Sequence, residues 1–163
     1  MRFCGLFGVT WSVHDACDLD ILLVEDDEND IFLMQRALEN NGIHARVQVV
    51  NDGQEALDYL RHSGRYEDRM RYPFPGVILM DLKMPRVSGL EVLRWLHGHP
   101  QCPAVPTIVF SASRMDADVR EAYRLGATSY FVKPTDFQEL QELVRLMHDY
   151  WRRAERPPVP ANC

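Results

Sequence analysis

The sequence predicts an α/β domain in which a parallel sheet carries helices on both faces. Short apolar runs alternate with longer segments whose apolar residues recur at helical spacing, and five such pairs follow one another. Alternation of this kind builds a parallel sheet, because each helix carries the chain back to begin the next strand. The run Val-Ile-Leu-Met-Asp at 77–81 is apolar up to a final carboxylate, which favours a strand buried on both faces.

The first strand is expected at 19–24, where the chain reads Leu-Asp-Ile-Leu-Leu-Val. A helix follows it, because Ile31, Met34 and Leu38 recur on one helical face. Gly42 is the expected stop for this helix, since glycine readily adopts the left-handed conformation found just after helix ends.

The second strand is expected at 45–50, and the helix after it ends near Gly64. Residues 63–75 are polar and charged and close with two prolines, which predicts a surface loop. This loop exceeds the usual connection of about 2–6 residues, so it is a candidate for a contact with another molecule.

The third strand, 77–81, precedes a helix that Ser88 is expected to cap and that runs to about His97. Residues 99–106 contain three prolines and predict a rigid connector. A fourth strand is expected directly after it, at 107–110.

The last two helices frame the fifth strand, which is expected at 129–132. Asp116 is a candidate cap for the helix before this strand. After the strand, Thr135-x-x-Gln138 has the spacing of a capping box and predicts the start of a helix that runs to about Trp151.

The five units predict a flavodoxin-like (βα)5 fold, a doubly wound parallel sheet with strand order 2-1-3-4-5. Its topological switch point lies between strands 1 and 3, so Glu25 and Asp26 after strand 1 should lie beside Asp81 after strand 3. Ser111 and Lys133 follow strands 4 and 5 and should meet them at the same edge.

Length and composition indicate one globular domain, 19–151, with an N-terminal extension at 1–18 and a Pro-rich tail at 152–163. A net charge of −6 argues against a nucleic-acid surface. No apolar run approaches the roughly 20 residues of a membrane span. The four cysteines lack CxxC spacing, which is typical of free thiols in the cytoplasm rather than of a zinc site or disulfides.

Three carboxylates at one sheet edge, from Glu25, Asp26 and Asp81, favour a bound cation, and Mg²⁺ suits hard oxygen ligands. Taken alone, the acids at 25–27 would be read as residues favoured by the helix dipole. An aspartate beside Mg²⁺ can attack phosphorus, and a hydroxyl from Ser111 and the ammonium of Lys133 could then bind phosphoryl oxygens. Either of those two residues alone would be an ordinary loop or strand-end residue.

These motifs together resemble the receiver domain of two-component response regulators. The matching stretches are Ile-Leu-Leu-Val-Glu-Asp-Asp at 21–27, Val-Ile-Leu-Met-Asp-Leu-Lys-Met-Pro at 77–85, Ser-Ala at 111–112 and Phe-Val-Lys-Pro at 131–134. The resemblance implies that Asp81 accepts a phosphoryl group from a sensor histidine kinase and that the protein is a signalling protein rather than an enzyme.

The same resemblance assigns roles to the other residues. Glu25, Asp26 and Asp81 hold Mg²⁺, with the backbone carbonyl of Lys83 as a further ligand. Ser111 and Lys133 bind the acyl phosphate, and Tyr130 is the switch aromatic. The switch hydroxyl here is serine, where threonine is commoner in the family, so the oxygen is kept and a methyl group is lost.

The sequence is more closely similar to stand-alone regulators that act with phytochrome-type kinases. Three features carry this likeness: Asn-Asp-Gly-Gln-Glu-Ala-Leu-Asp-Tyr-Leu-Arg at 51–61, the long loop before strand 3, and the Asp-Tyr-Trp ending at 149–151. It implies a homodimer formed through the last helices and a C-terminal arm. An ordinary aromatic helix end followed by a tail is the alternative.

Three other functions stay open from the residues. A Mg²⁺-dependent phosphatase with an aspartyl nucleophile usually has an acid two residues later, where this chain has Lys83. A binding module that no longer takes phosphate is the second alternative, although every functional position is filled. A flavodoxin is the third, but the acidic first turn is a poor cradle for a phosphate group.

Overall fold

The computed structural model describes residues 19–99 and 105–154. The predicted N-terminal extension, part of the proline-containing connector and most of the tail lie outside these residues. The strands are β1 (Leu19–Val24), β2 (Ala45–Val50), β3 (Val77–Met80), β4 (Thr107–Ser111) and β5 (Ser129–Val132). The helices are α1 (Glu28–Asn40), α2 (Gly53–Leu60), the short 3₁₀ helix η1 (Gly64–Tyr66), α3 (Gly89–Gly98), α4 (Asp116–Arg124) and α5 (Phe137–Arg153).

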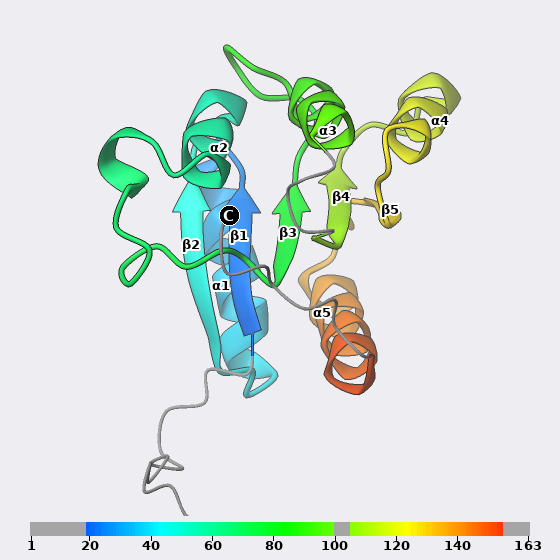
Figure 1. Ribbon diagram of the computed structural model, residues 1–163. Coiled ribbons are helices and arrows are strands. Elements are labelled where there is room, and N and C mark those ends of the chain that lie inside the picture. The colour runs from blue at the N-terminus through cyan, green and yellow to red at the C-terminus, as the bar shows by residue number, and fades with distance from the viewer. Residues whose placement is uncertain (1–18, 100–104, 155–163) are drawn as a thin grey trace, which may run out of the picture.

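The five strands form one parallel sheet in the order β2-β1-β3-β4-β5 (Figure 1), which confirms the predicted topology. The chain reverses its direction of winding between β1 and β3. Val24 pairs with Met80, so these two strands end level with each other. The residues that follow them, Glu25 and Asp81, therefore emerge side by side at the switch point.

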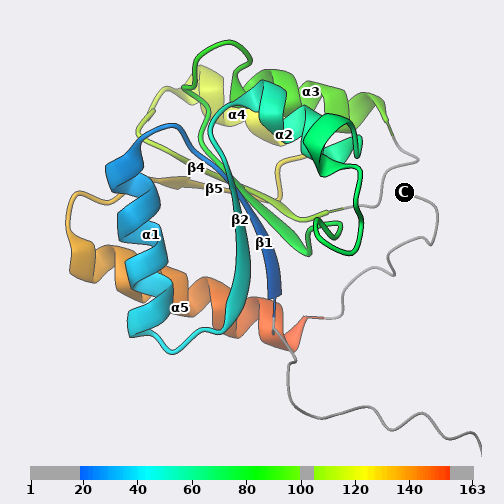
Figure 2. The ribbon, with the colours of Figure 1, turned by 90° about the vertical axis from the view of Figure 1, so that its left-hand side faces the viewer.

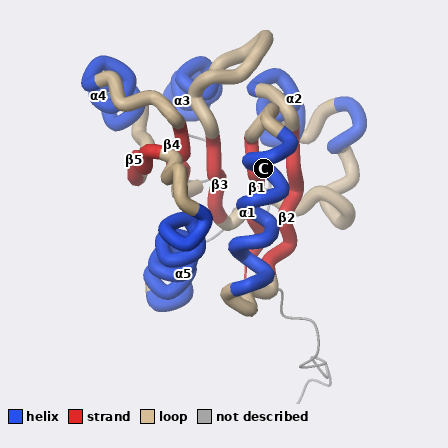
Figure 3. The backbone as a smooth tube through the Cα atoms, turned by 180° about the vertical axis from the view of Figure 1, so that it is seen from behind, coloured by secondary structure: helices blue, strands red, loops and turns tan. Residues whose placement is uncertain are grey.

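Helices cover both faces of the sheet. Figures 2 and 3 show α1 and α5 side by side on one face, and α2, α3 and α4 on the other. Successive strand residues point to opposite faces, so Leu22 and Ile78 belong to the core under α2 and α3, whereas Ile21 and Leu79 belong to the core under α1 and α5. Burial on both faces explains why β3 is a continuous apolar run.

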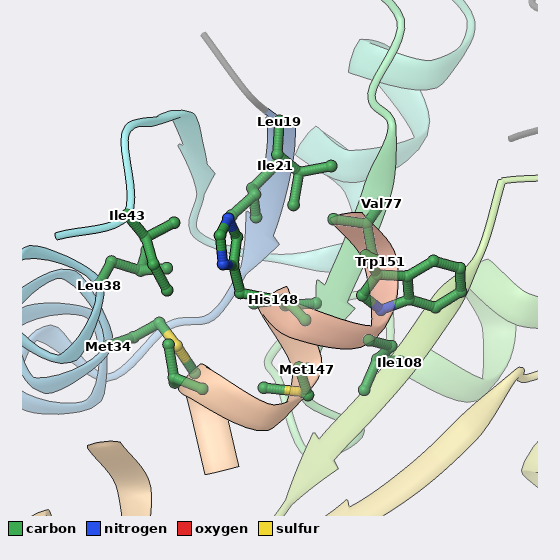
Figure 4. Close-up of a pocket in the computed structure, with 12 residues that line it drawn as sticks. Leu19, Ile21, Met34, Leu38, Ile43, Val77, Ile108, Met147, His148 and Trp151 are labelled. Atoms are coloured by element: carbon green, nitrogen blue, oxygen red, sulfur yellow. The ribbon is translucent and has the colours of Figure 1, made fainter. Parts of the chain in front are cut away.

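The α1–α5 face contains a small apolar pocket at the end of the sheet opposite Asp81. Leu19 and Ile43 line one side of it, and Met147, His148 and Trp151 of α5 line the other (Figure 4). Apart from His148, the described residues that line this pocket are apolar. The charged side chains that could carry chemistry gather instead at the carboxyl ends of the strands.

Two predicted helix caps are wrong, and one is confirmed. Met115 precedes α4, and Asp116 is its first helical residue rather than its cap. Asp136, not Thr135, caps α5: its backbone is still extended and its carboxylate accepts from the Gln138 amide, so the helix begins one residue later than expected. Ser88 does cap α3, and it forms a reciprocal capping box with Glu91.

The loop predicted at 63–75 has a core of its own. It contains η1 and places Tyr66 and Tyr72 edge-on against Tyr59 of α2. Tyr66 is only 2% exposed, so the prediction of a plain surface loop was wrong for this residue. The polar composition hid the cluster because each aromatic side chain is separated from the next by charged residues.

No helix among the described residues has the length and apolar character needed to cross a lipid bilayer.

Candidate functional site

Asp81 is the first residue after β3, and the fold holds its side chain in a buried position at the sheet edge. Its carboxylate oxygen Oδ1 accepts hydrogen bonds from the backbone amides of Leu82, at 2.5 Å, and Lys83, at 3.3 Å. The residue is only 7% exposed. Gly89 lies directly against the Asp81 carbonyl, because a Cβ at this position would be 2.2 Å from that oxygen. The start of α3 thus packs against the end of β3.

Glu25 and Asp26 follow β1 and lie beside Asp81, as the switch-point topology predicted. A carboxylate oxygen from each of the three residues lies within 4.8 Å of the other two. Glu25 and Asp81 are buried, whereas Asp26 is exposed, so the cluster opens to solvent on the Asp26 side. The next acid, Asp27, has a structural role, because its carboxylate caps α1 by accepting from the amides of Asn29 and Asp30.

Lys133 follows β5 and places its ammonium among these acids. Its Nζ lies 2.9 Å from Asp81 Oδ2 and 2.7 Å from Glu25 Oε2. A third partner is Asp30 Oδ2, at 2.6 Å. One cation therefore balances much of the negative charge that the sheet edge gathers.

Asp30 is the contact that sequence reasoning missed. The first turn of α1 is rich in acids, and all of them fit the helix dipole. Local spacing gave no signal for this contact, because Asp26 precedes the helix cap Asp27 and the i, i+4 relation of a helix does not reach it. The partner of Asp30, Lys133, is 103 residues away in the chain.

Burial raises the pKa of Glu25 to about 6, since a charged carboxylate is disfavoured away from water, although Lys133 partly opposes the rise. Burial also acts to lower the pKa of Lys133. Hydrogen bonds to Asp30, Glu25 and Asp81 outweigh this effect and hold the pKa of Lys133 above its usual value. Lys133 is therefore a permanent cation at this site.

Ser111, the last residue of β4, is fully buried, and its Oγ accepts from the Ser113 amide at 3.4 Å. Tyr130, in β5, donates its hydroxyl to the Ser113 carbonyl at 2.9 Å. Burial raises the pKa of this tyrosine, which keeps it a neutral donor. The two predicted switch residues thus meet at one loop residue, Ser113.

The donor set of the acidic cluster fits Mg²⁺. The cluster offers hard oxygen ligands from one buried and one exposed aspartate and a buried glutamate, and its open side leaves room for the waters that Mg²⁺ retains. The backbone carbonyl of Lys83 as a further ligand stays a prediction. With Lys133 at the inner side, the site can hold a divalent cation and a phosphoryl group next to Asp81.

A (βα)5 sheet that gathers carboxylates and one lysine ammonium at the carboxyl ends of its strands is typical of a signalling receiver module. The family model for the response regulator receiver domain matches residues 21–145, and this chain belongs to that family.

Related proteins place the chain more closely. It is 38% identical over 142 residues to the probable methanogenesis regulatory protein FilR2 of Methanothrix harundinacea, covering 86% of this chain and 88% of that protein. It is 32% identical over 131 residues to the response regulator Rcp1 of Synechocystis, covering 80% of this chain and 87% of that protein. The solved structure of the phosphorylated cyanobacterial phytochrome response regulator RcpA aligns with a TM-score of 0.78 and 34% identity, over 86% of this chain and 98% of that one. The chain is thus homologous to phytochrome response regulators.

Proposed function

We propose that this protein is a phosphorylation switch in which Asp81 accepts a phosphoryl group from the phosphohistidine of a sensor histidine kinase. The observation that carries the proposal is the placement of Asp81 beside the acids that follow β1 and in contact with the ammonium of Lys133. A buried carboxylate that contacts a cation and opens to solvent on one side is both held in place and reachable.

In the transfer, an Oδ oxygen of Asp81 attacks phosphorus while the bond from phosphorus to the imidazole nitrogen breaks. The electron pair of that bond returns to the imidazole, and Asp81 becomes an acyl phosphate. Lys133, whose ammonium is already 2.9 Å from Asp81 Oδ2, neutralises the added charge on the phosphoryl oxygens. Ser111 offers a hydroxyl donor from the end of β4.

Glu25, Asp26, Asp81 and the Lys83 carbonyl would hold Mg²⁺. When bound, this ion supplies charge neutralisation between the carboxylates and the phosphoryl oxygens.

The test is labelling of the intact chain with acetyl phosphate and Mg²⁺, followed by intact-mass measurement. We expect the wild-type protein to gain one phosphoryl group, and EDTA to prevent this. Asp81→Asn should abolish the gain. Asp27→Asn is the matched control: it removes a carboxylate one residue from Asp26, keeps an equally good helix cap, and should label like the wild type. Full labelling of Asp81→Asn would disprove the assignment.

We further propose that Ser111 and Tyr130 transmit the change. In this proposal, the Ser111 hydroxyl moves toward the phosphoryl group and Tyr130 fills the space behind it. The face formed by α4, β5 and α5 then changes shape, and a partner reads it. Phosphorylation biases two arrangements of one face, as in other charge-driven switches. Tyr130→Ala should leave labelling intact while abolishing the phosphorylation-dependent change in binding to that partner.

The partner kinase is proposed to be of the phytochrome type, and the proposed compartment is the cytoplasm. The homology to phytochrome response regulators supports the pairing. Phosphotransfer from a panel of the host's purified histidine kinases tests it. Preference for the phytochrome-type kinase at short reaction times is the expected outcome, and preference for any other kinase would contradict it.

We also propose a homodimer through the C-terminal helices and arm. Leu146 and Tyr150 support this, because they lie four residues apart on α5 and are 52% and 62% exposed. Light scattering coupled to gel filtration should show a dimer for the wild type and a monomer for the double variant Leu146→Glu, Tyr150→Glu. An unchanged mass would contradict the proposed interface.

A further inference from the structure

One carboxylate outside the acidic cluster connects two loops of the site to α4. Asp118 lies in the first turn of α4, and its Oδ2 oxygen accepts both from Lys83 Nζ, at 3.0 Å, and from Ser113 Oγ, at 2.5 Å. Its side chain is 14% exposed. We refer to Lys83, Ser113 and Asp118 together as the α4 latch.

Each loop residue of the α4 latch also contacts a residue of the proposed phosphorylation site. Lys83 stands two positions after Asp81, and its amide donates to the Asp81 carboxylate. Ser113 stands two positions after Ser111, and its amide donates to the Ser111 hydroxyl. A displacement of Asp81 should therefore move Lys83, and a displacement of Ser111 should move Ser113. Both of these residues are bonded to Asp118 of α4.

The position of Lys83 carries the inference further. Lys83 stands two residues after Asp81, yet its ammonium pairs with Asp118. The ammonium that contacts the Asp81 carboxylate belongs to Lys133. The Lys83 side chain is 61% exposed, so no packed neighbours among the described residues prevent it from changing its rotamer and leaving Asp118. Phosphorylation replaces the single negative charge of the Asp81 carboxylate with an acyl phosphate that carries about two negative charges and three strong acceptor oxygens. It would attract the nearest mobile cation.

We propose that Asp118 is a positioning residue that anchors α4 to the site, and that a phosphoryl group on Asp81 competes with Asp118 for the Lys83 ammonium. Release of Lys83 removes one of the two hydrogen-bonded partners that hold the first turn of α4. The inference rests on the proposed function of Asp81 and adds the route by which phosphorylation reaches α4. Coupling of this kind is reciprocal, so a change at Asp118 must alter binding at Asp81.

The experiment uses the full chain with Mg²⁺ and beryllofluoride, an analogue of the phosphoryl group. Affinity for the analogue is read from the fluorine NMR signal of the bound ion. Opening of α4 is measured as faster hydrogen exchange of its backbone amides from Val119 onward. The Val119 amide makes the first hydrogen bond of the helix, which it donates to the Met115 carbonyl. Labelling by acetyl phosphate is measured first on every variant, so that loss of the proposed function is recognised separately.

The two variants should have opposite effects on affinity for the analogue and the same effect on hydrogen exchange in α4. Asp118→Asn should bind the analogue about two- to five-fold more tightly, because Lys83 is released, whereas Lys83→Ala should bind it more weakly. Both variants should raise exchange in α4 without the analogue, and the analogue should then add little. General destabilisation would weaken binding in both variants, so it cannot produce this pattern.

Asp116→Asn is the matched control. It removes the same charge two residues earlier in α4, at an exposed side chain, and should behave as wild type in both assays. Asp118→Glu should restore part of the wild-type exchange. If Asp118→Asn matched Asp116→Asn in affinity and exchange while all variants were labelled, the α4 latch would be refuted alone. If the wild type were not labelled, the proposed function would fail and the inference with it.

Discussion

At the scale of single residues, the central feature of the site is the ammonium of Lys133, which lies among the carboxylates that would hold Mg²⁺. It contacts Glu25, Asp30 and Asp81 at once. This ammonium is thus an internal counter-ion for the acidic cluster. Such an arrangement keeps buried carboxylates charged, which would otherwise be costly.

Removing this ammonium should have opposite effects on metal binding and on chemistry. Lys133→Met keeps the apolar stem but leaves the carboxylates to the metal alone, so Mg²⁺ should bind about ten-fold more tightly, a gain of ~1.4 kcal/mol. Labelling by acetyl phosphate should slow, because the phosphoryl oxygens lose a cation. Calorimetric titration and intact-mass kinetics measure the two effects. Weaker Mg²⁺ binding in the variant would contradict this account of Lys133.

A second ion pair lies outside the acidic cluster, between Asp52 at the start of α2 and Arg86 in the loop after β3. Arg86 adopts a left-handed backbone, φ 63°, which is strained for a residue with a side chain, and the ion pair helps to hold it there. Burial acts to raise the pKa of Asp52. Hydrogen bonds from the Glu55 amide and from Arg86 outweigh that effect and hold the pKa below its usual value.

This pair predicts a pH-dependent stability difference. Because the folded-state pKa of Asp52 is lower than its unfolded value of about 3.9, its contribution is present above that pH and is lost as the pH falls through the folded value. Asp52→Asn keeps a helix cap but loses the charge, and should lower the free energy of unfolding at pH 7 by about 1–2 kcal/mol. Urea denaturation should show this difference shrinking below pH 4. A difference that stayed constant down to pH 2 would argue against the charged pair.

At the scale of elements, the site depends on how closely α3 approaches β3. Gly89 begins α3 directly above the Asp81 carbonyl, and no larger residue fits without moving one of them. Gly89→Ala should therefore lower the free energy of unfolding by about 1–3 kcal/mol and slow labelling of Asp81.

Gly98 at the other end of the same helix provides the comparison. Among the described residues, an added Cβ there meets nothing within 4 Å, and alanine is the better helix former, so Gly98→Ala should be neutral or stabilise by about 0.5 kcal/mol. Chemical denaturation of both variants, with labelling kinetics, measures the contrast. Equal effects of the two substitutions would mean that the contact with Asp81 is unimportant.

The elements themselves were largely predictable from local pattern. The β3 run is apolar at every position because it is buried on both faces. Four consecutive apolar residues were therefore enough to predict a buried strand. The caps of α4 and α5 were less predictable, because several polar residues compete for each role. Asp118, for example, is bonded to Lys83 and Ser113 from two other loops, which no local pattern reveals.

At the scale of the whole molecule, the site lies where β1 and β3, which are far apart in the sequence, end at the same level of the sheet. The topology brought Glu25, Asp26 and Asp81 together, as predicted, because strand order alone decides which ends are neighbours. The contact between Asp30 and Lys133 was not predicted, since it depends on the rotation of α1 and on the path of a long side chain. Sequence patterns thus located the edge but not its full charge network.

Binding of Mg²⁺ at this edge should stabilise the entire fold, because an ion that binds only the folded chain shifts the unfolding equilibrium. At about 100 times its dissociation constant, the gain is ~2.7 kcal/mol. The melting temperature should then rise by roughly 5–10 °C. Differential scanning calorimetry with Mg²⁺ or EDTA measures the shift. Asp26→Asn should reduce it and Asp27→Asn should not, and an equal shift in both would place the ion elsewhere.

The tyrosine cluster of the loop before β3 has a consequence for how this domain can change during evolution. The loop is fixed at its far end by a hydrogen bond from the Tyr59 hydroxyl to the Pro73 carbonyl, at 2.7 Å, and by one from the Gly76 amide to the Asp20 carbonyl, at 2.8 Å. These anchors set the start of β3 whatever path the chain takes between them. Insertions and deletions at this position can therefore accumulate, and new surfaces can arise, without shifting Asp81 by a single residue in register.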